Sequence, residues 1–550
     1  MGGEGTSPND LSHVKWCKKV KVPAAYKSFG SSIRDVEWRA IRLGQLRELA
    51  ALVQQVVTRT EITDSFNGNA RVTWDSANMY HIDGHITRPL TQHFKCSFVE
   101  LIAKEGEQRP KWFVSHWWGT PFQQTVALLG FHAEQRKIQA PSDAAYWICT
   151  FANCQHDLSG LQVTDLRQSP FVKAILSPGC DGTVALLDQH VTTFTRVWCV
   201  LENFVSTTWA REGGEAHLYD LAAWLPEGGK YGGKPVPAKP TLRMDLGDGR
   251  VDERVQDEAT GGAFPLMVAA RGVHIDLSKA KATQPADRLQ ILHCIAGTDP
   301  AEQSGPPPEA CGAYDAVNAN AQRSFAPGAM QGAALRGDAT ELRELLGRFP
   351  DSKDDGISDG ATPLHAAAWK GHAEVIGLLL ESGASPNSRK DDGATPIFQP
   401  AQMGSVGTCE VLLRARADAN LCRGDGVSPL LMAAQQGHLK VVDCLLRGGA
   451  DPNLQSKSGS TPLRAAAKHA AVKRALREAG AAEPEAEAGP RRGGEPGGGR
   501  RGPPHPAPAP FGGLMAEFEA NQAGRPGRNP AAVAGMLAEL EEAQGPAAGA

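Results

Sequence analysis

Three features that would assign a protein class at once are missing from this chain of 550 residues. No apolar run approaches the roughly 18 residues of a membrane span, and no secretory apolar region opens the chain. Neither sign of charge is in excess: 57 basic residues face 61 acidic ones for a net charge of −4, which argues against a nucleic-acid partner. The eleven cysteines have no paired spacing and suit a reducing compartment better than a disulfide scaffold. We therefore expect a cytoplasmic protein.

Glycine and proline are abundant instead, with 60 and 38 residues, against typical shares of roughly 7% and 5%. This excess indicates linkers and tails between about two to four domains. We expect a disordered start at 1–30, an α/β domain at 31–300, a Pro-rich linker at 301–327, repeats at 328–482 and a disordered tail at 483–550. Two apolar stretches of the tail, "FGGLMAEFEAN" and "PAAVAGMLAELEEA", are candidates for helices formed on a partner.

The first residues allow two interpretations. "MGGEGT" fits the myristoylation pattern, with Gly2 as acceptor and Thr6 at the required offset, and the basic stretch "KWCKKVK" follows. One acyl chain binds membranes weakly, so these lysines would supply the second signal. The chain is therefore either membrane-associated through acylated Gly2 or simply disordered at its start.

Residues 328–482 repeat with a fixed period. Three segments begin with "DGATPLHAAAWKGH", "DGATPIFQPAQMGS" and "DGVSPLLMAAQQGH", and a fourth begins with "SGSTPLRAAAKHAA". The steps are all 33 residues: Thr362, Thr395, Ser428 and Thr461; Gly371, Gly404 and Gly437; Asn387, Asn420 and Asn453. This region resembles the ankyrin repeat family. The resemblance implies an all-α solenoid of about five helix pairs, with a degenerate first repeat from Gly328 and a degenerate last one.

The periodic residues have physical roles in such a repeat. Thr or Ser caps a helix that begins with Pro, and Gly ends it. The third repeat departs from this pattern because Pro400 falls inside its expected first helix, at a cost of up to about 3 kcal/mol. We therefore expect the third repeat to be the weakest.

Ankyrin resemblance implies binding of other proteins on the concave face and at the hairpin tips. The residues expected to contact a partner there are Trp369, Lys370, Met403, Gln435, Gln436, Lys468 and His469. The alternative is that these side chains only keep the stack in solution, since few interface residues carry binding energy.

The first 300 residues alternate between strand-like and helical patterns. "KWFVSHWWG", "AAYWICTFA", "GTVALLDQH" and "EAHLYDLAAW" predict strands, with helical stretches such as "PFQQTVALLGFHAEQRK" and "ADRLQILHCIAG" among them. An amphipathic helix is expected over 33–57. Such alternation predicts a mostly parallel sheet, flavodoxin-like, with helices on both faces and sites at the carboxyl ends of the strands.

Within this domain, "FVSHWWG" and the later motif Trp198-Cys199-x-x-Glu202 resemble the Toll/interleukin-receptor (TIR) superfamily over residues 110–300. In members that cleave NAD the Glu of this motif is catalytic, which implies the same role for Glu202. The resemblance also implies that His116, Trp117 and Trp118 lie near the ligand, and Arg196 is suited to pair with phosphate. Arg196 and Asn203 depart from the usual residues of the family at their positions. TIR domains also self-associate.

Two functions therefore remain open. In one, the chain is a signalling adaptor that binds proteins through its ankyrin repeats, and Glu202 is a structural hydrogen-bonding residue. In the other, the first domain is an NAD hydrolase regulated by the repeats, in which an ionised Glu202 stabilises an oxocarbenium-like transition state. NAD is a substrate in that case, and no cofactor is expected. No metal site is expected either, because Cys149, Cys154 and His156 lack a second ligand pair.

Overall fold

The computed structural model describes residues 11, 14–65, 67–158, 165–188, 190–210, 217–225, 230–231, 234–235, 239–245, 251–255, 266–276, 279–282, 285–298, 306, 308, 311–357 and 359–482. Gly2 with its acylation pattern, and the expected helices of the tail at 483–550, lie outside the described residues. Within the described ranges, no helix combines the length and the apolar character needed to cross a membrane.

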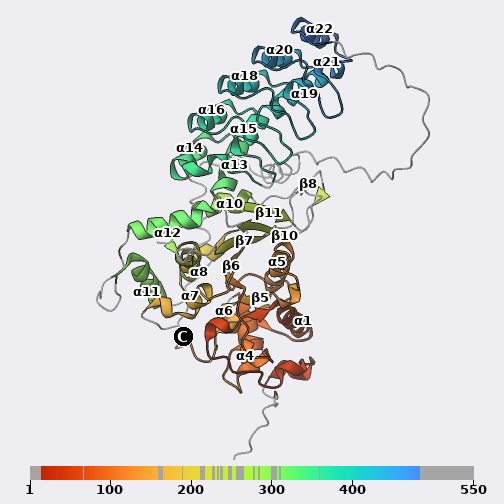
Figure 1. The fold of residues 1–550 in the computed structure, drawn as a ribbon. Coiled ribbons are helices and arrows are strands. Elements are labelled where there is room, and N and C mark those ends of the chain that lie inside the picture. The colour runs from red at the N-terminus through yellow and green to blue at the C-terminus, as the bar shows by residue number, and fades with distance from the viewer. Residues whose placement is uncertain are drawn as a thin grey trace, which may run out of the picture.

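A seven-stranded sheet forms the centre of the N-terminal α/β domain, in the order β1-β5-β4-β6-β7-β10-β11 (Figure 1). Strands β5, β4, β6 and β7 pair in parallel, whereas β1, β10 and β11 join antiparallel. The strands span Ile41–Arg42 (β1), Trp112–His116 (β4), Ala145–Trp147 (β5), Gly182–Leu187 (β6), Leu218–Leu225 (β7), Lys239–Asp245 (β10) and Val251–Val255 (β11). The second parallel strand lies outside the first, as in flavodoxin-type sheets. The expected mostly parallel α/β domain is confirmed.

Helices cover both faces of this sheet because strand residues alternate in direction. On β4, Trp112 and Val114 join a core with helices α1 and α5, whereas Phe113 joins a core with α7, α8 and α11. The helices span Leu43–Arg59 (α1), Met79–Ile82 (α2), Arg88–Thr91 (α3), Phe98–Ile102 (α4), Phe122–Gln135 (α5), Cys149–Ala152 (α6), Pro170–Ile175 (α7), Val197–Phe204 (α8), Leu266–Gly272 (α10) and Pro285–Ala296 (α11). The carboxyl end of β4 is thus enclosed by elements from both layers.

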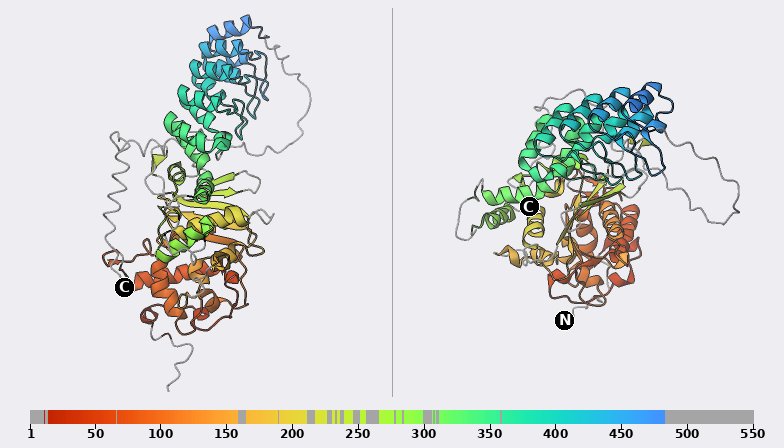
Figure 2. Two further views of the ribbon diagram at one scale, coloured as in Figure 1. Left: turned by 90° about the vertical axis from the view of Figure 1, so that its left-hand side faces the viewer. Right: turned by 45° about the horizontal axis from the view of Figure 1, so that its top comes forward.

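Five helix pairs follow and form an elongated stack (Figures 1 and 2). They are α13 and α14 (Ala326–Arg336, Ala339–Arg348), α15 and α16 (Pro363–Lys370, Ala373–Glu381), α17 and α18 (Phe398–Met403, Val406–Arg414), α19 and α20 (Pro429–Gln436, Leu439–Arg447), and α21 and α22 (Pro462–Ala465, Ala470–Glu478). The inner helices α15, α17 and α19 end at Gly371, Gly404 and Gly437, whose φ angles are 73°, 79° and 78°. Only glycine adopts that conformation without strain.

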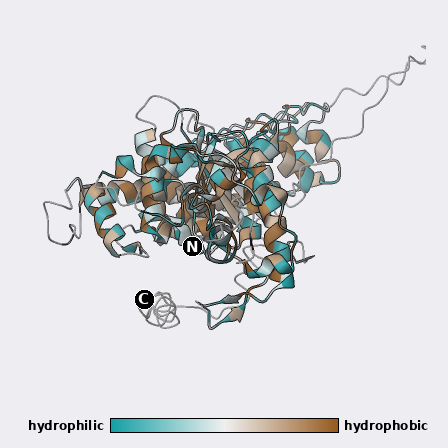
Figure 3. Cartoon of the chain, turned by 90° about the horizontal axis from the view of Figure 1, so that it is seen from below, coloured by the Kyte–Doolittle hydropathy of each residue, from teal (hydrophilic) through white to brown (hydrophobic). Residues whose placement is uncertain are grey.

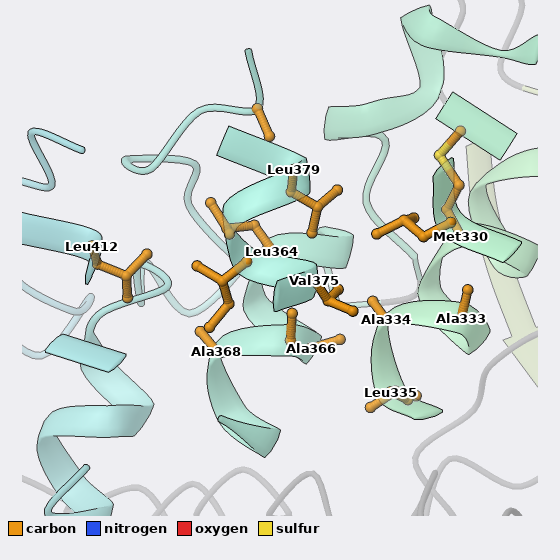
Figure 4. Close-up of a cluster of buried hydrophobic side chains, with 14 of the residues drawn as sticks. Met330, Ala333, Ala334, Leu335, Leu364, Ala366, Ala368, Val375, Leu379 and Leu412 are labelled. Atoms are coloured by element: carbon orange, nitrogen blue, oxygen red, sulfur yellow. The ribbon is translucent and has the colours of Figure 1, made fainter. Parts of the chain in front are cut away.

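Hydrophilic and hydrophobic residues alternate along the helices of the chain (Figure 3). In the repeats, the apolar residues of neighbouring helix pairs pack against one another. Figure 4 shows one such cluster, to which α13, α15, α16 and α18 contribute Met330, Ala334, Leu364, Val375, Leu379 and Leu412. The same core continues into the α/β domain, where it includes Leu221 of β7 and Val273 after α10. The repeat stack is therefore packed directly on the sheet domain.

The stretch 301–327, expected to be a linker, contains helix α12 (Gly312–Arg323) and the first residues of α13. Its prolines at 306–308 precede α12. Tyr314 and Val317 of α12 are buried in the core that also contains α8 and α11. Their helical spacing creates one apolar face, and burying that face stabilises the helix.

Two local predictions in the sheet domain were wrong. The helix expected over 33–57 begins only at Leu43, because Ile41 and Arg42 form β1 and pair with Tyr146 and Ala145 of β5. The strand expected in "AAYWICTFA" ends at Trp147, and α6 follows. Short apolar runs do not by themselves distinguish a strand from a buried helical turn.

The position of Pro400 also differs from the expectation. Helix α17 begins at Phe398, two residues later than the repeat pattern predicts, so Pro400 is its third residue. The first four N–H groups of a helix have no partner within the helix, and a proline in that turn therefore removes no hydrogen bond. The chain accommodates Pro400 by shortening the helix rather than by breaking it.

Candidate functional site

Helix α8, which carries Cys199 and Glu202, lies across the carboxyl end of β4. The Cys199 thiol donates to the carbonyl oxygen of His116, the last residue of β4, with 3.6 Å between sulfur and oxygen. In the sheet, β5 lies on one side of β4 and the next strand in the chain, β6, lies on the other side. The order of the strands therefore reverses at β4. Ligands of open α/β sheets bind at such a switch point, outside the carboxyl ends of the strands.

Glu202 is buried there, with an exposed fraction of 5%. Its Oε2 atom has no hydrogen-bond partner among the described residues, and neither has the nearby hydroxyl of Ser115. Burial raises the pKa of Glu202 to about 8, although the Ser115 hydroxyl and the Cys199 thiol favour the ionised form. At neutral pH the carboxyl is therefore mostly protonated.

His116, the last residue of β4, is buried as well. Because side chains alternate along the strand, its ring shares the face of Trp112 and Val114, opposite to α8. Its Nε2 atom has no hydrogen-bond partner in the described part of the chain, and the hydroxyl of Thr120 is unpaired as well. Burial lowers the pKa of His116 to about 4, so the imidazole is neutral at pH 7. Together with Ser115 and Glu202, four side chains at this end of the sheet carry a buried polar atom without a partner. Buried polar groups are normally paired, so these four are candidates for binding water or a ligand.

Trp118 lies over the cluster. Its indole N–H donates to Cys149 Sγ at 3.3 Å, and its ring packs on Tyr80 with 5.3 Å between ring centroids. The pKa of Cys149 is raised to about 12, first by burial and then by the charge of Glu202, so the thiol is close to that carboxyl. Tyr80 and Cys149 come from parts of the sequence without a recognisable motif. Only the fold brings them to Glu202.

The other residues expected at this site lie around it. The Arg196 backbone bridges to Lys281, and the half-buried Arg196 cation influences the pKa of both Tyr80 and Cys199. Trp117 folds its ring back against Gly119, where an added Cβ would lie 2.3 Å from a ring carbon. Arg196 is thus electrostatically coupled to the cluster.

Trp198, the first residue of the motif, does not join this cluster. Its indole N–H donates to Asp287 Oδ2 at 3.1 Å, and its ring stacks on Phe171 with 4.9 Å between centroids. His156, which follows α6, is not part of the cluster either, because it is hydrogen-bonded to Thr91 Oγ1 at 2.9 Å. The motif therefore contributes Cys199 and Glu202 to the site, while its tryptophan supports the helix.

The residues expected to bind a partner lie at the ends of the inner repeat helices. Met403, Gln435, Gln436 and Lys468 are exposed, with 57% of Met403 accessible, and Trp369 and Lys370 are half-buried. The Lys370 ammonium lies 4.7 Å from the Trp369 ring centroid. These side chains form one row along the stack.

His469 belongs to this row but also has a structural contact. Its Nε2 atom lies 3.2 Å from Gln435 O of the preceding repeat, and His372 and His438 make the same kind of contact with Leu335 O and Gln402 O. The Nε2–H group of each imidazole thus donates a hydrogen bond to a backbone carbonyl oxygen of the preceding repeat. The Gly-His pairs at 371–372 and 437–438 could have indicated this role for two of the three histidines, whereas His469 follows Lys468.

Comparison with known proteins identifies the repeats. A family model described as ankyrin repeats (3 copies) matches residues 329–421 and 401–487. Oxysterol-binding protein-related protein 1 from Homo sapiens is 49% identical over 57 residues, 10% of this chain and 6% of that protein. The E3 ubiquitin-protein ligase XBAT33 from Arabidopsis thaliana is 48% identical over 58 residues, 10% of this chain and 11% of that protein.

The chain therefore spans about a tenth or less of the length of these curated relatives. The ankyrin repeats expected from the 33-residue period are confirmed. No family match identifies the N-terminal domain, so its similarity to TIR domains stays a prediction.

Proposed function

We propose that this protein is a signalling adaptor that binds protein partners through its ankyrin repeats, joined to a TIR-like domain that self-associates. One observation carries the proposal: the inner helices present an aromatic ring at Trp369 and a largely exposed apolar side chain at Met403. Aromatic residues and methionine are enriched in protein interfaces. Ankyrin repeats imply protein partners in general.

A capture experiment tests this function. The purified full chain serves as bait, and Met403→Glu and Trp369→Ala are compared with Lys440→Glu, which changes the exposed outer helix α20 instead. We expect the first two variants to lose partners that the wild type and the Lys440 variant retain. Identical partners for all four proteins would contradict binding through the inner helices.

A second function, NAD hydrolysis, is favoured by the buried carboxyl group of Glu202 among unpaired polar atoms at the end of β4. The bond between nicotinamide and ribose breaks, and its electron pair leaves with nicotinamide. Water adds to the cationic ribose carbon and releases a proton. An ionised Glu202 stabilises that cation, and Arg196 and the indoles of Trp117 and Trp118 are suited to hold the phosphates and the base.

Nicotinamide release tests this second function. Because Glu202 ionises only near pH 8, activity of the wild type should rise between pH 6 and 8. Glu202→Gln keeps the shape but loses the charge, so we expect at least about a hundredfold loss. Concentrated wild-type protein that releases no nicotinamide above a blank would exclude the activity and leave Glu202 as a structural residue.

A further inference from the structure

The segment at 14–34 lies along the sheet domain with one side packed and the other exposed. Six of its apolar side chains join the core that contains α1 and α5, namely Val14, Trp16, Val20, Val22, Tyr26 and Ile33. The Trp16 indole N–H also donates to His85 O at 2.7 Å. Exposed and buried residues alternate over 19–22, so the lysine side chains there point away from the domain.

The exposed side of this segment is cationic. Its six charged side chains are all basic and all exposed: Lys15, Lys18, Lys19, Lys21, Lys27 and Arg34. The sequence has no Asp or Glu over 14–34, and no carboxylate of the described residues pairs with any of the six. Glu100, which accepts from the Ile33 N–H, pairs with Arg39 instead. Described side chains therefore leave the positive charge of this surface unneutralised.

The cations of the first turn lie on one side, and Lys27 is close to them. Residues three apart share a side of a 3₁₀ helix, and Lys15–Lys18 is such a helix. Burial raises the pKa of the Cys17 thiol to about 11, and the Lys27 cation opposes this rise, so Lys27 lies within electrostatic range of that helix.

An exposed aromatic ring lies beside these cations. Phe29 is 41% exposed, and its ring packs on that of Phe94 with 5.5 Å between centroids. The exposed Lys95 follows Phe94. The lysine surface, defined as the six cations of 14–34 together with Phe29, thus combines charge of one sign with an accessible apolar side chain.

We propose that the lysine surface binds a membrane that contains anionic phospholipids, with the Phe29 ring inserted among the headgroups. Lysine clusters are attracted to anionic headgroups, and an apolar side chain adds burial at the boundary of the acyl chains. Figures 1 and 2 show this segment, in red, at the end of the sheet domain remote from the repeats. Binding there requires no acyl group on Gly2 and leaves the repeats accessible to partners.

The type of cation favours a membrane over a protein partner. Five of the six cations are lysines, and lysine is depleted in protein interfaces whereas arginine is enriched there. Diffuse attraction to a charged lipid surface needs no fixed geometry, and long lysine side chains can lay their stems on the apolar boundary while the ammonium groups remain at the headgroups.

Flotation with lipid vesicles tests the proposal on the full, unacylated chain made in bacteria. We expect binding to vesicles of equal parts phosphatidylserine and phosphatidylcholine, much weaker binding to pure phosphatidylcholine, and a loss of binding in high salt, which screens the charges. Each lysine near an anionic surface strengthens binding roughly fivefold. Lys18→Gln combined with Lys19→Gln should therefore weaken binding at least about tenfold.

Matched variants separate the lysine surface from general effects of charge and hydrophobicity. Lys440→Gln with Lys457→Gln removes the same charge from exposed positions of the repeats and should bind like the wild type. Phe29→Ser should weaken binding about threefold or more, whereas Leu289→Ser, at a side chain 42% exposed on α11, should not.

Three results would overturn the proposal. One is equal binding of the wild type to both kinds of vesicle. Another is an affinity that the double lysine variant or Phe29→Ser leaves unchanged, or that the control variants lower as much. The third is tighter binding of this surface to a single-stranded oligothymidine than to the anionic vesicles, which would assign it to nucleic acid.

Discussion

The ring of Phe194, which follows β6, packs edge to face on the ring of Phe325, with 5.7 Å between their centroids. Phe325 immediately precedes α13 of the first repeat and is fully buried. Helix α10 lies at the same junction, where Gly272 faces the Phe325 ring and Ala269 faces Gly328. The sheet domain and the ankyrin repeats therefore meet through close packing, which leaves no room for an added methyl group at Gly272.

Gly272→Ala tests this junction. An added Cβ would lie 2.2 Å from Phe325 Cγ, and a buried ring cannot move away from it. Overpacking of this kind lowers the free energy of unfolding by about 1–3 kcal/mol, measured by urea denaturation of the full chain.

Gly377→Ala is the matched control, because its Cβ meets nothing within 4 Å in helix α16. Alanine favours a helix over glycine by about 1 kcal/mol, so this variant should be slightly more stable. Equal effects of the two substitutions would contradict tight packing at Gly272.

The buried carboxyl of Glu202 predicts a pH-dependent stability. The unfolded chain ionises this group near its ordinary pKa of 4.5, whereas the folded chain keeps the proton up to about pH 8. The stability that protonated Glu202 contributes to the folded state is thus fully present below pH 4.5, and it is lost as the pH rises to 8.

Glu202→Gln removes this titration. The stability of the variant relative to the wild type should therefore rise between pH 5 and 8, by up to about 1.4 kcal/mol per pH unit. Chemical denaturation at four pH values measures it. A constant difference would show that the folded and unfolded states ionise Glu202 alike.

The buried His365 of the second repeat predicts the opposite pH dependence of stability. Its Nδ1 lies 2.9 Å from Thr362 Oγ1 and its Nε2 lies 3.2 Å from Ala394 O, and burial lowers its pKa to about 4. Stability from the neutral ring is present above pH 6.5 and is lost as the pH falls to 4. His365→Leu, which introduces the residue type found at Leu431, should be less stable than the wild type at pH 7, and the gap should narrow at pH 5. A gap that widens in acid would contradict a buried neutral histidine.

Pro400→Ala tests why α17 is short. Because Pro400 lies in the first turn and blocks no used N–H group, its replacement should change stability by less than about 1 kcal/mol, rather than the 3 kcal/mol of an interior proline. Hydrogen exchange at 397–399 should slow if the helix extends, and Thr395 would then cap it. A gain near 3 kcal/mol would show that Pro400 strains the helix.

The repeats could be predicted from the sequence because each uses local chemistry. Thr or Ser before Pro, and Gly at the end, define the inner helix within about ten residues, and the 33-residue step locates the next one. The delayed start of α17 was missed, since the pattern alone does not show that a proline shifts a helix start as readily as it breaks a helix.

The sequence by itself determined the ankyrin period, the alternation of strands and helices in the first domain and the location of Glu202 shortly after a strand, because these depend on spacing along the chain. The tertiary structure alone decided the rest. Ser115 and Cys149 lie near Glu202, and Tyr80 lies near Cys149, through contacts between distant segments. Burial there, which no local pattern encodes, raises the pKa of Glu202. Phe325 likewise became a core residue because α10 and Phe194 enclose it. Burial depends on how all layers pack, so it follows from the fold as a whole rather than from any one stretch.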